Sequence, residues 1–431
     1  MKSRFSNSFA FLLFVLTVAS VVQTEGAGAA GDGEFDRIVD LTQKIRGLDF
    51  KDPVKFERLS KPDLSKMLKE ELSRLYSEED WRLVQSSLVL LGAIPEELEL
   101  KEFLYDLMSD QIAGLYDPHT KRMYVVGDLS LQVGLTQIVL EHELTHAVTD
   151  QHFDLLSLPI EEIHNDDRSQ AALALVEGDA TLSMIEYAQE LDISDALTTL
   201  IVSLFMNQDT FEAAPPYFQA SLIFPYLGGE VFLLEAMTLY TTDGDRLVER
   251  SKEDRVREGF MNWKLVDYFY TNPPKSTEQI LHPEKIGIDP DEPVEVVLEP
   301  LPQELTAVGY EPRWENSMGE FSIKSLLMNS LSPLKATRAA EGWGGDRYVL
   351  LENDSGGRVL HWKTVWDTER DAQEFRDAYE LFSGGEAFEQ RTIALLEFSD
   401  HPNEVIVRIG TDEKSLASVP STDEEIHDTN P

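Results

Sequence analysis

The chain has 431 residues, of which 37 are Lys or Arg and 79 are Asp or Glu, so its formal net charge is −42 at pH 7. The composition is that of a globular protein with two or three domains, and the strong negative charge argues against binding to nucleic acid, because phosphates would repel it. There is no cysteine, which excludes disulfides, thiolate metal sites and cysteine nucleophiles, so a metal site would have to use His, Asp or Glu.

The first 29 residues have the layout of a secretory signal peptide. Lys2 and Arg4 give a positive start, residues 9–22 are mostly apolar, and residues 27–29 read Ala-Gly-Ala, which fits a cleavage site. The apolar run is shorter than the about 20 residues of a membrane-spanning helix, although an uncleaved anchor stays an alternative. We therefore expect a secreted or periplasmic protein without stable membrane insertion once the signal is removed.

Residues 34–287 form the first predicted domain. Its first part, to residue 113, has the apolar spacing of helices. Residues 113–127 then change the pattern, because Asp117-Pro118 is a turn signal with β-branched and aromatic residues on both sides. This pattern predicts a strand, a turn and a second strand, followed by a long helix at 135–153.

The helix at 135–153 carries the motif His142-Glu143-Leu144-Thr145-His146, an H-E-x-x-H pattern. Residues i and i+4 share one face of a helix, so both imidazoles can reach one metal ion. Glu143 can then lie beside a metal-bound water without being a ligand, which is the position that a general base requires. Zinc is favoured because it accepts imidazole and carboxylate ligands and needs no thiolate. A helix with two half-buried histidines in a structural protein without metal is the alternative.

A catalytic zinc needs a third protein ligand, and two residues compete for that role. His152 has the spacing of the third ligand in the metzincin signature, but Thr149 stands where that signature has a turning glycine. On a straight helix, six residues correspond to a rotation of about 240°, which points His152 away from the first two histidines. Glu177 lies in a second long helix at 167–191, where Gly178 would let the two helices approach closely. Ligand geometry favours Glu177.

Four further residues are candidates for supporting roles. Asp150 and Asp179 could orient a ligand histidine through a hydrogen bond. Peptide hydrolysis also needs a group that stabilises the developing oxyanion, for which Tyr226 and His282 are candidates. Each has a structural alternative, since Tyr226 suits a core and His282 suits a helix cap. The hairpin before the motif could offer an edge on which an extended peptide lies.

The C-terminal third has a different organisation. Residues 288–303 are acidic and contain four prolines, and we interpret them as a linker. Residues 304–410 show a β-β-α-β-β order, which predicts a small α+β module. Residues 411–431 form a polar, acidic tail that we expect to be flexible.

Several stretches resemble a known class of enzymes. The His142-Glu143-x-x-His146 helix with a downstream Glu177-Gly-Asp-Ala resembles the gluzincin class of zinc metallopeptidases. Ala-Gly-Leu-Tyr-Asp-Pro from Ala113, together with these two motifs, looks like a group of secreted prokaryotic predicted metallopeptidases that are largely uncharacterised. The likeness extends over residues 100–380, and only its zinc motif is mechanistically specific.

The resemblance implies a zincin-like domain with zinc bound by His142, His146 and Glu177, and with Glu143 as the base. Thr181 stands where thermolysin-type motifs carry Asp, which puts the groups around the ligands in doubt. The fold expected is α+β, mainly helical, with a small sheet beside the motif helix and a small C-terminal α+β unit.

The expected function is zinc-dependent hydrolysis of peptide bonds outside the cytoplasm. Its substrate would be a peptide or protein, and Glu143 would activate the zinc-bound water. The alternative is a non-catalytic, zincin-like binding protein of the cell exterior, with the C-terminal module as its recognition part.

Overall fold

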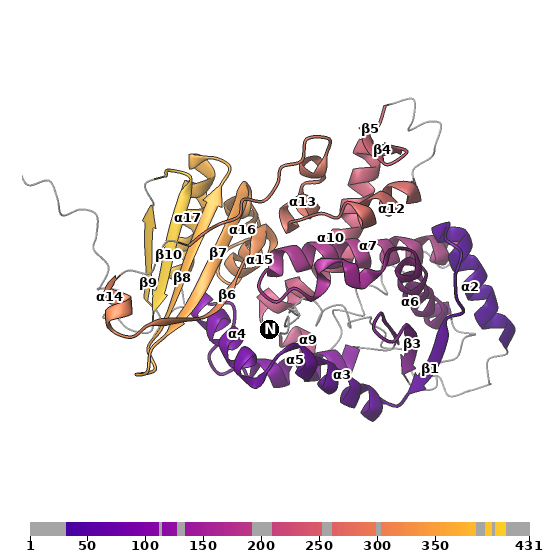
Figure 1. Ribbon diagram of the computed structural model, residues 1–431, viewed down its shortest axis with the longest axis horizontal. Coiled ribbons are helices and arrows are strands. Elements are labelled where there is room, and N and C mark those ends of the chain that lie inside the picture. Colours follow the sequence, from indigo (N-terminus) through magenta and orange to yellow (C-terminus); the bar gives the residue numbers. More distant parts are fainter. Residues whose placement is uncertain are drawn as a thin grey trace, which may run out of the picture. The chain divides into compact units, whose positions relative to one another are not determined.

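The computed structural model, drawn in Figure 1, describes residues 32–111, 114–126, 134–191, 209–251, 261–298, 303–384, 393–398 and 401–410. The predicted signal peptide and the acidic tail lie outside these residues. The described parts are mixed α+β, as the sequence predicts, with mostly helical segments and three small sheets. The contacts divide the chain into two units.

The first unit comprises residues 1–78, 99–293 and 319–325. Its long helices are α2 (Asp32–Arg46), α3 (Lys61–Leu75), α5 (Leu100–Gln111), α6 (Gly134–Phe153), α7 (Asp166–Glu190) and α10 (Pro216–Leu239). Its shorter helices are η1 (Leu155–Ser157), η2 (Pro159–Glu161), α9 (Asp209–Glu212), α12 (Trp263–Thr271), α13 (Thr277–Leu281), η3 (Pro283–Ile286) and most of α15 (Gly319–Leu327). Its strands are β1 (Lys55–Leu59), β2 (Gly114–Asp117), β3 (Arg122–Val126), β4 (Tyr240–Asp243) and β5 (Arg246–Glu249).

A three-stranded sheet lies next to the motif helix α6. The predicted hairpin is present as the antiparallel pair β2 and β3, and β1 adds to β3 in parallel to give the order β1-β3-β2. Strand β1 falls in a region for which the sequence pattern predicted helices alone. Its residues Lys-Phe-Glu-Arg-Leu are mostly exposed, so the strand depends on its pairing with β3. The sequence has no alternation of buried apolar residues here from which a strand could be predicted.

Helices α6, α7 and α10 make up the centre of this unit (Figure 1). Helix α7 is buried along most of its length, since α6, α10 and α2 all pack against it. Helix α10 is long and apolar enough to cross a membrane by length and composition, but half of its most apolar window is buried inside the structure. Core helices of soluble proteins share these properties, and the buried face of α10 packs on α7.

The apolar core beside α6 joins segments that are distant in the chain. Ile38 of α2, Tyr116 and Val125 of the hairpin, and Leu140 and Leu144 of α6 belong to one buried cluster. Helix α2 is therefore part of the core of the first unit.

The second unit comprises residues 79–98, 294–318 and 326–431. Its helices are α4 (Glu78–Leu91), α14 (Gln303–Ala307), α16 (Pro333–Ala340) and α17 (Glu369–Ser383), and its strands are β6 (Glu311–Asn316), β7 (Trp343–Glu352), β8 (Arg358–Trp366), β9 (Ile393–Phe398) and β10 (Glu404–Gly410). These strands form one antiparallel sheet in the order β6-β7-β8-β10-β9. The β7-β8-α17-β9-β10 sequence has the predicted β-β-α-β-β order, to which the structure adds β6.

Helix α4 joins this unit although it precedes the sheet by more than 200 residues in the chain. The Arg82 guanidinium donates to both carboxylate oxygens of Glu352 at 2.7 Å, and Arg358 donates to the Ser86 hydroxyl at 3.4 Å. The sequence analysis included α4 in the predicted domain at 34–287. Contacts between residues so far apart in the chain cannot be predicted from local sequence patterns.

A buried carboxylate organises the second unit. Asp346 on β7 accepts hydrogen bonds from the indole nitrogens of Trp343 at 3.0 Å and Trp362 at 2.9 Å, and from the backbone N–H of Met318 at 3.0 Å. Trp362 and Phe375 of α17 then pack edge to face. The carboxylate thereby connects three segments and satisfies donors that would otherwise be buried without partners.

We expect the substitution Asp346→Asn to lower the free energy of unfolding of the second unit by about 3 kcal/mol, because one amide oxygen cannot accept from all three donors. Chemical denaturation followed by tryptophan fluorescence measures the change. The matched control is Asp354→Asn in the exposed β7–β8 turn, for which a change below about 0.5 kcal/mol is expected. Equal effects of the two substitutions would show that the buried carboxylate has no special role.

Candidate metal centre

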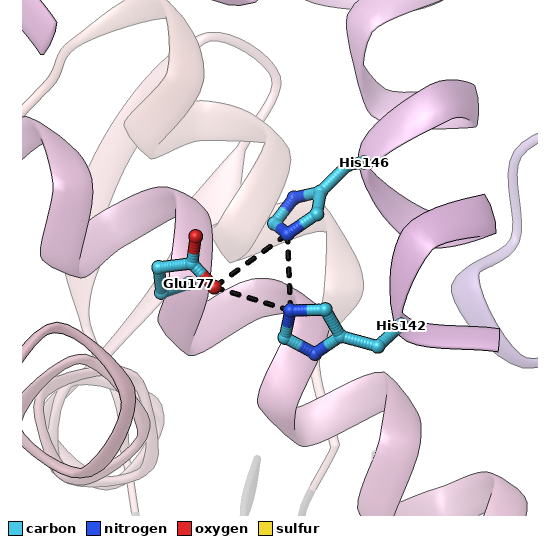
Figure 2. Close-up of side chains that lie close together, drawn as sticks. All are labelled: His142, His146 and Glu177. Carbon is cyan, nitrogen blue, oxygen red and sulfur yellow. Dashed lines mark hydrogen bonds and ion pairs between the residues drawn. The ribbon is translucent and has the colours of Figure 1, made fainter. Parts of the chain in front are cut away.

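Helix α6 places the two motif histidines on one face, as Figure 2 shows. The Nε2 atoms of His142 and His146 lie 3.0 Å apart, and the two rings meet nearly at right angles. Both side chains are buried. The spacing of four residues along the helix therefore brings the two imidazoles together, as the sequence predicts.

Helix α7 brings Glu177 to the same point (Figure 2). Its Oε2 atom lies 3.1 Å from His142 Nε2 and 3.5 Å from His146 Nε2. Ligand atoms that surround a tetrahedral zinc ion at its usual bond lengths are separated by about 3.3 Å. The three side chains thus have the spacing of a group that could hold a metal ion.

The polar atoms of this group fit a bound cation. Among the residues that the structure describes, His142 Nδ1, Glu143 Oε1 and Glu177 Oε1 are buried without a hydrogen-bond partner. Buried polar atoms are nearly always paired. A cation could pair with the carboxylate oxygens, whereas His142 Nδ1 is the ring nitrogen opposite to the Nε2 that faces Glu177, and an ion there would not pair with it. The two imidazole nitrogens and the carboxylate oxygen that face one another are the atoms that a cation could share, and without an ion the imidazoles can hydrogen-bond Glu177.

Electrostatics favour a charged Glu177. Burial raises the pKa of Glu177, but the neighbouring His146 and His142 outweigh this effect and lower the pKa below its usual value. For His146, burial lowers the pKa, while the charge of Glu177 and its hydrogen bond raise it, and the net pKa is above the usual value. The carboxylate is therefore available as an anionic ligand at neutral pH.

Glu143 lies next to this group without belonging to it. Its Oε2 atom accepts a hydrogen bond from the backbone N–H of Tyr116 in β2 at 2.5 Å, and its side chain is buried. Because this N–H group is already used, the β2 edge beside α6 does not offer it to a peptide substrate. Strand β2 is an edge strand of its sheet, so the expectation that an extended peptide lies along this edge stays a prediction for positions other than the Tyr116 N–H.

Tyr226 of α10 lies against one of the two motif histidines. Its ring stacks on His142 with 6.1 Å between centroids and an interplanar angle of 29°. Burial and the charges of Glu177 and Glu143 raise the pKa of its hydroxyl well above the usual value, so the phenol stays protonated. A protonated hydroxyl in this place can donate a hydrogen bond.

The structure places the other candidates elsewhere. His152 Nε2 contacts the backbone oxygen of Asp49 at 2.8 Å, so its ring turns away from the other histidines, as the helix rotation predicts. His282 Nε2 pairs with Glu320 Oε1 at 3.0 Å, and this hydrogen bond raises the pKa of the imidazole. Neither histidine belongs to the group that could hold a metal.

The two aspartates expected to orient a ligand histidine have other described partners. Asp150 accepts from the Tyr116 hydroxyl and from the Lys121 ammonium. Asp179 pairs with the Arg46 guanidinium at 2.7 Å, where both side chains are fully buried, and accepts from the Tyr270 hydroxyl at 2.9 Å. The charge of Asp179 still contributes to the raised pKa of His146.

Glycines set the position of α7, but not against the helix that the sequence suggested. A Cβ atom on Gly178 would lie 2.4 Å from the carbonyl carbon of Gly229 in α10, and a Cβ on Gly229 would lie 1.9 Å from the oxygen of Ala174. The close approach is therefore between α7 and α10, and it brings Tyr226 over His142. Gly229 and Arg46 are the residues that sequence reasoning missed, because no local pattern reveals a partner so distant in the chain.

A second group, of Glu71, His119 and Glu161, also has the spacing of metal ligands but is more exposed. Arg74 already supplies a cation there, since its Nη2 atom lies 3.0 Å from both His119 Nε2 and a Glu161 oxygen. This group is an ion-pair network around an arginine, and we assign it no metal.

Comparison with known proteins gives one match. A family model described as a domain of unknown function (DUF8575) matches residues 307–425, which lie in the second unit apart from part of α15. Comparisons with curated proteins and with solved structures found no match. The matched segment does not include the candidate metal centre.

We expect Gly229→Ala to destabilise the first unit by about 3 kcal/mol, because the added Cβ forces α10 away from the backbone of α7. Thermal unfolding followed by circular dichroism measures this. Val231→Ala, at a half-exposed position of the same helix, should change the stability by less than about 1 kcal/mol. An unaltered unfolding temperature for Gly229→Ala would contradict the close helix contact.

Proposed function

We propose that the chain is a zinc-dependent peptidase of gluzincin type that acts on peptides or proteins outside the cytoplasm. The observation that carries the proposal is the convergence of His142, His146 and Glu177 from two helices, with Glu143 adjacent. The signal-peptide pattern of the first 29 residues supports the secreted or periplasmic location.

The donor set favours zinc among common metals. Two imidazoles and one carboxylate form the ligand set of catalytic zinc sites, whereas magnesium and calcium prefer oxygen donors alone. When bound, zinc would polarise a substrate carbonyl and lower the pKa of a water molecule.

The residues of the chain have distinct roles in this proposal. Oε2 of Glu143 accepts the hydrogen bond from the Tyr116 N–H. Oε1 is then the oxygen that takes a proton from the attacking water and passes it to the leaving amine. The water oxygen forms a bond to the peptide carbon, the carbon–nitrogen bond breaks, and a carboxylate and an amine result. Tyr226 can donate a hydrogen bond to the developing oxyanion.

One observation favours a second function, a binding protein with a structural metal. The four side chains His142, Glu143, His146 and Glu177 are at most 3% exposed. Structural zinc sites are closed, whereas catalytic sites keep an open position for water or substrate. Turnover separates the two functions, since a structural metal would be bound without any hydrolysis of peptides.

Elemental analysis should find about one zinc ion per chain in the zinc-reconstituted protein and a loss of this zinc in Glu177→Ala, because two histidines alone bind zinc weakly. The control is His152→Ala, which should keep its zinc since His152 contacts Asp49. Zinc retained in Glu177→Ala but lost in His152→Ala would move the third ligand to His152. Absence of zinc from the wild type would rule out the proposed function.

We expect Glu143→Gln to lower kcat on a cleaved peptide by about 10³-fold or more, because an amide cannot accept the proton of the attacking water. Zinc content should be unchanged, since Glu143 is not a proposed ligand. The measurement is turnover on a quenched fluorescent peptide library with wild type and variant at equal zinc loading. The control is Glu141→Gln, the same substitution two residues earlier on α6, which leaves Glu143 in place. It shows how much of the loss comes from altering the helix itself.

A further inference from the structure

The hairpin β2–β3 contacts the motif helix at two points seven residues apart. The backbone N–H of Tyr116 donates to Glu143, and the hydroxyl of the same tyrosine donates to Asp150 Oδ2 at 2.6 Å. Positions i and i+7 lie within about 20° of each other around a helix, so both carboxylates are on one side of α6. A single residue of β2 thus spans two turns of the motif helix.

Asp150 is buried and accepts hydrogen bonds from the hairpin. Lys121, in the β2–β3 turn, places its Nζ 2.7 Å and 2.9 Å from the two oxygens of Asp150, and the Leu155 backbone N–H donates to Oδ1 at 3.0 Å. Lys121 has a φ of 54°, in the left-handed region that a lysine rarely adopts. The turn therefore holds an uncommon backbone conformation from which Lys121 reaches Asp150.

Gly114 at the start of β2 lies against α6. A Cβ atom at Gly114 would lie 3.3 Å from Val139 Cγ1, which is a tight contact, and 3.5 Å from Glu143 Cγ, which is ordinary van der Waals contact. Two residues further along β2, the Tyr116 N–H donates to Glu143 of α6, while the strand register pairs Tyr116 with Met123 of β3.

We propose that Asp150 is a positioning residue that acts through the hairpin on Glu143. Asp150 fixes Tyr116 and Lys121, and Tyr116 in turn holds Glu143 Oε2 so that Oε1 faces its reaction partner. The catalytic part of this inference rests on the proposed function. The linkage from Asp150 through Tyr116 to Glu143 rests only on the observed hydrogen bonds. It assigns Asp150 a role different from orienting a histidine.

The first test needs neither metal nor substrate. In the metal-free full chain labelled with ¹⁵N-tyrosine, hydrogen exchange is measured at the Tyr116 amide, which is assigned by its loss in Tyr116→Phe. We expect Glu143→Ala to speed this exchange by about tenfold or more, because the amide loses its acceptor. The Tyr124 amide in the β2–β3 ladder is the internal control and should not change. Fast exchange of Tyr116 in the wild type, or no effect of Glu143→Ala, would overturn the proposal.

The second test asks whether Asp150 acts through the hairpin. Asp150→Asn should also speed exchange of the Tyr116 amide by about tenfold, because both hairpin contacts weaken. The matched control is Asp154→Asn, which removes an exposed carboxylate 3.7 Å from the same Lys121 ammonium and should leave the amide protected. If Asp150→Asn does not fold, Tyr116→Phe labelled with ¹⁵N-phenylalanine reports on the loss of the hydroxyl contact alone. An amide as protected as in the wild type in the folded variant would refute the role of Asp150.

Turnover then links positioning to catalysis. With zinc content equal to the wild type, Asp150→Asn should lower kcat by about tenfold and change KM by less than about twofold, because the base is misplaced while substrate contacts remain. An unchanged kcat together with fast Tyr116 exchange would overturn the catalytic role. Failure of the proposed function has a different signature, since Glu143→Gln would then leave turnover unaltered or no turnover would be found.

Discussion

The contact of α7 with α10 through Gly178 and Gly229 is the constraint on which the centre of the first unit depends. Because neither residue has a Cβ, the two backbones meet where any other residue would collide. This contact sets the position of Glu177 one residue earlier on α7 and that of Tyr226 three residues earlier on α10. Helix α6 then needs only its own periodicity to bring two histidines to the same place.

Two buried charged groups among the described residues of this unit meet a partner of opposite charge, which agrees with the high free energy of an isolated buried charge. Arg46 pairs with Asp179 of α7, and Lys121 pairs with Asp150 of α6. The group of His142, His146 and Glu177 differs, because two imidazoles, and no described lysine or arginine, meet its carboxylate. That contrast is the physical argument for an ion at this site and for none at the Arg74 network, whose cation is already present.

Local patterns in the sequence predicted what depends on short separations. The i and i+4 histidines, the hairpin at 114–126 and the α+β class follow from periodicity and turn residues, and the distance of Glu177 from both histidines agrees with its choice over His152. Strand β1 and the membership of α4 in the second unit could not be predicted in this way. Both depend on partners that lie far away in the chain, and neither has an apolar pattern of its own that specifies the partner.

The partners of Asp150 could not be predicted from helix geometry. An aspartate four residues after His146 is well placed to orient that imidazole, and the sequence holds no sign that a tyrosine and a lysine of the hairpin bind it instead. The consecutive residues His142 and Glu143 lie about 100° apart around α6, so that His142 meets Glu177 of α7 while Glu143, like Asp150, meets Tyr116 of β2. The metal ligands and the proposed base are thus positioned by different elements. A change in the hairpin can therefore move the base while the ligand geometry stays as it is.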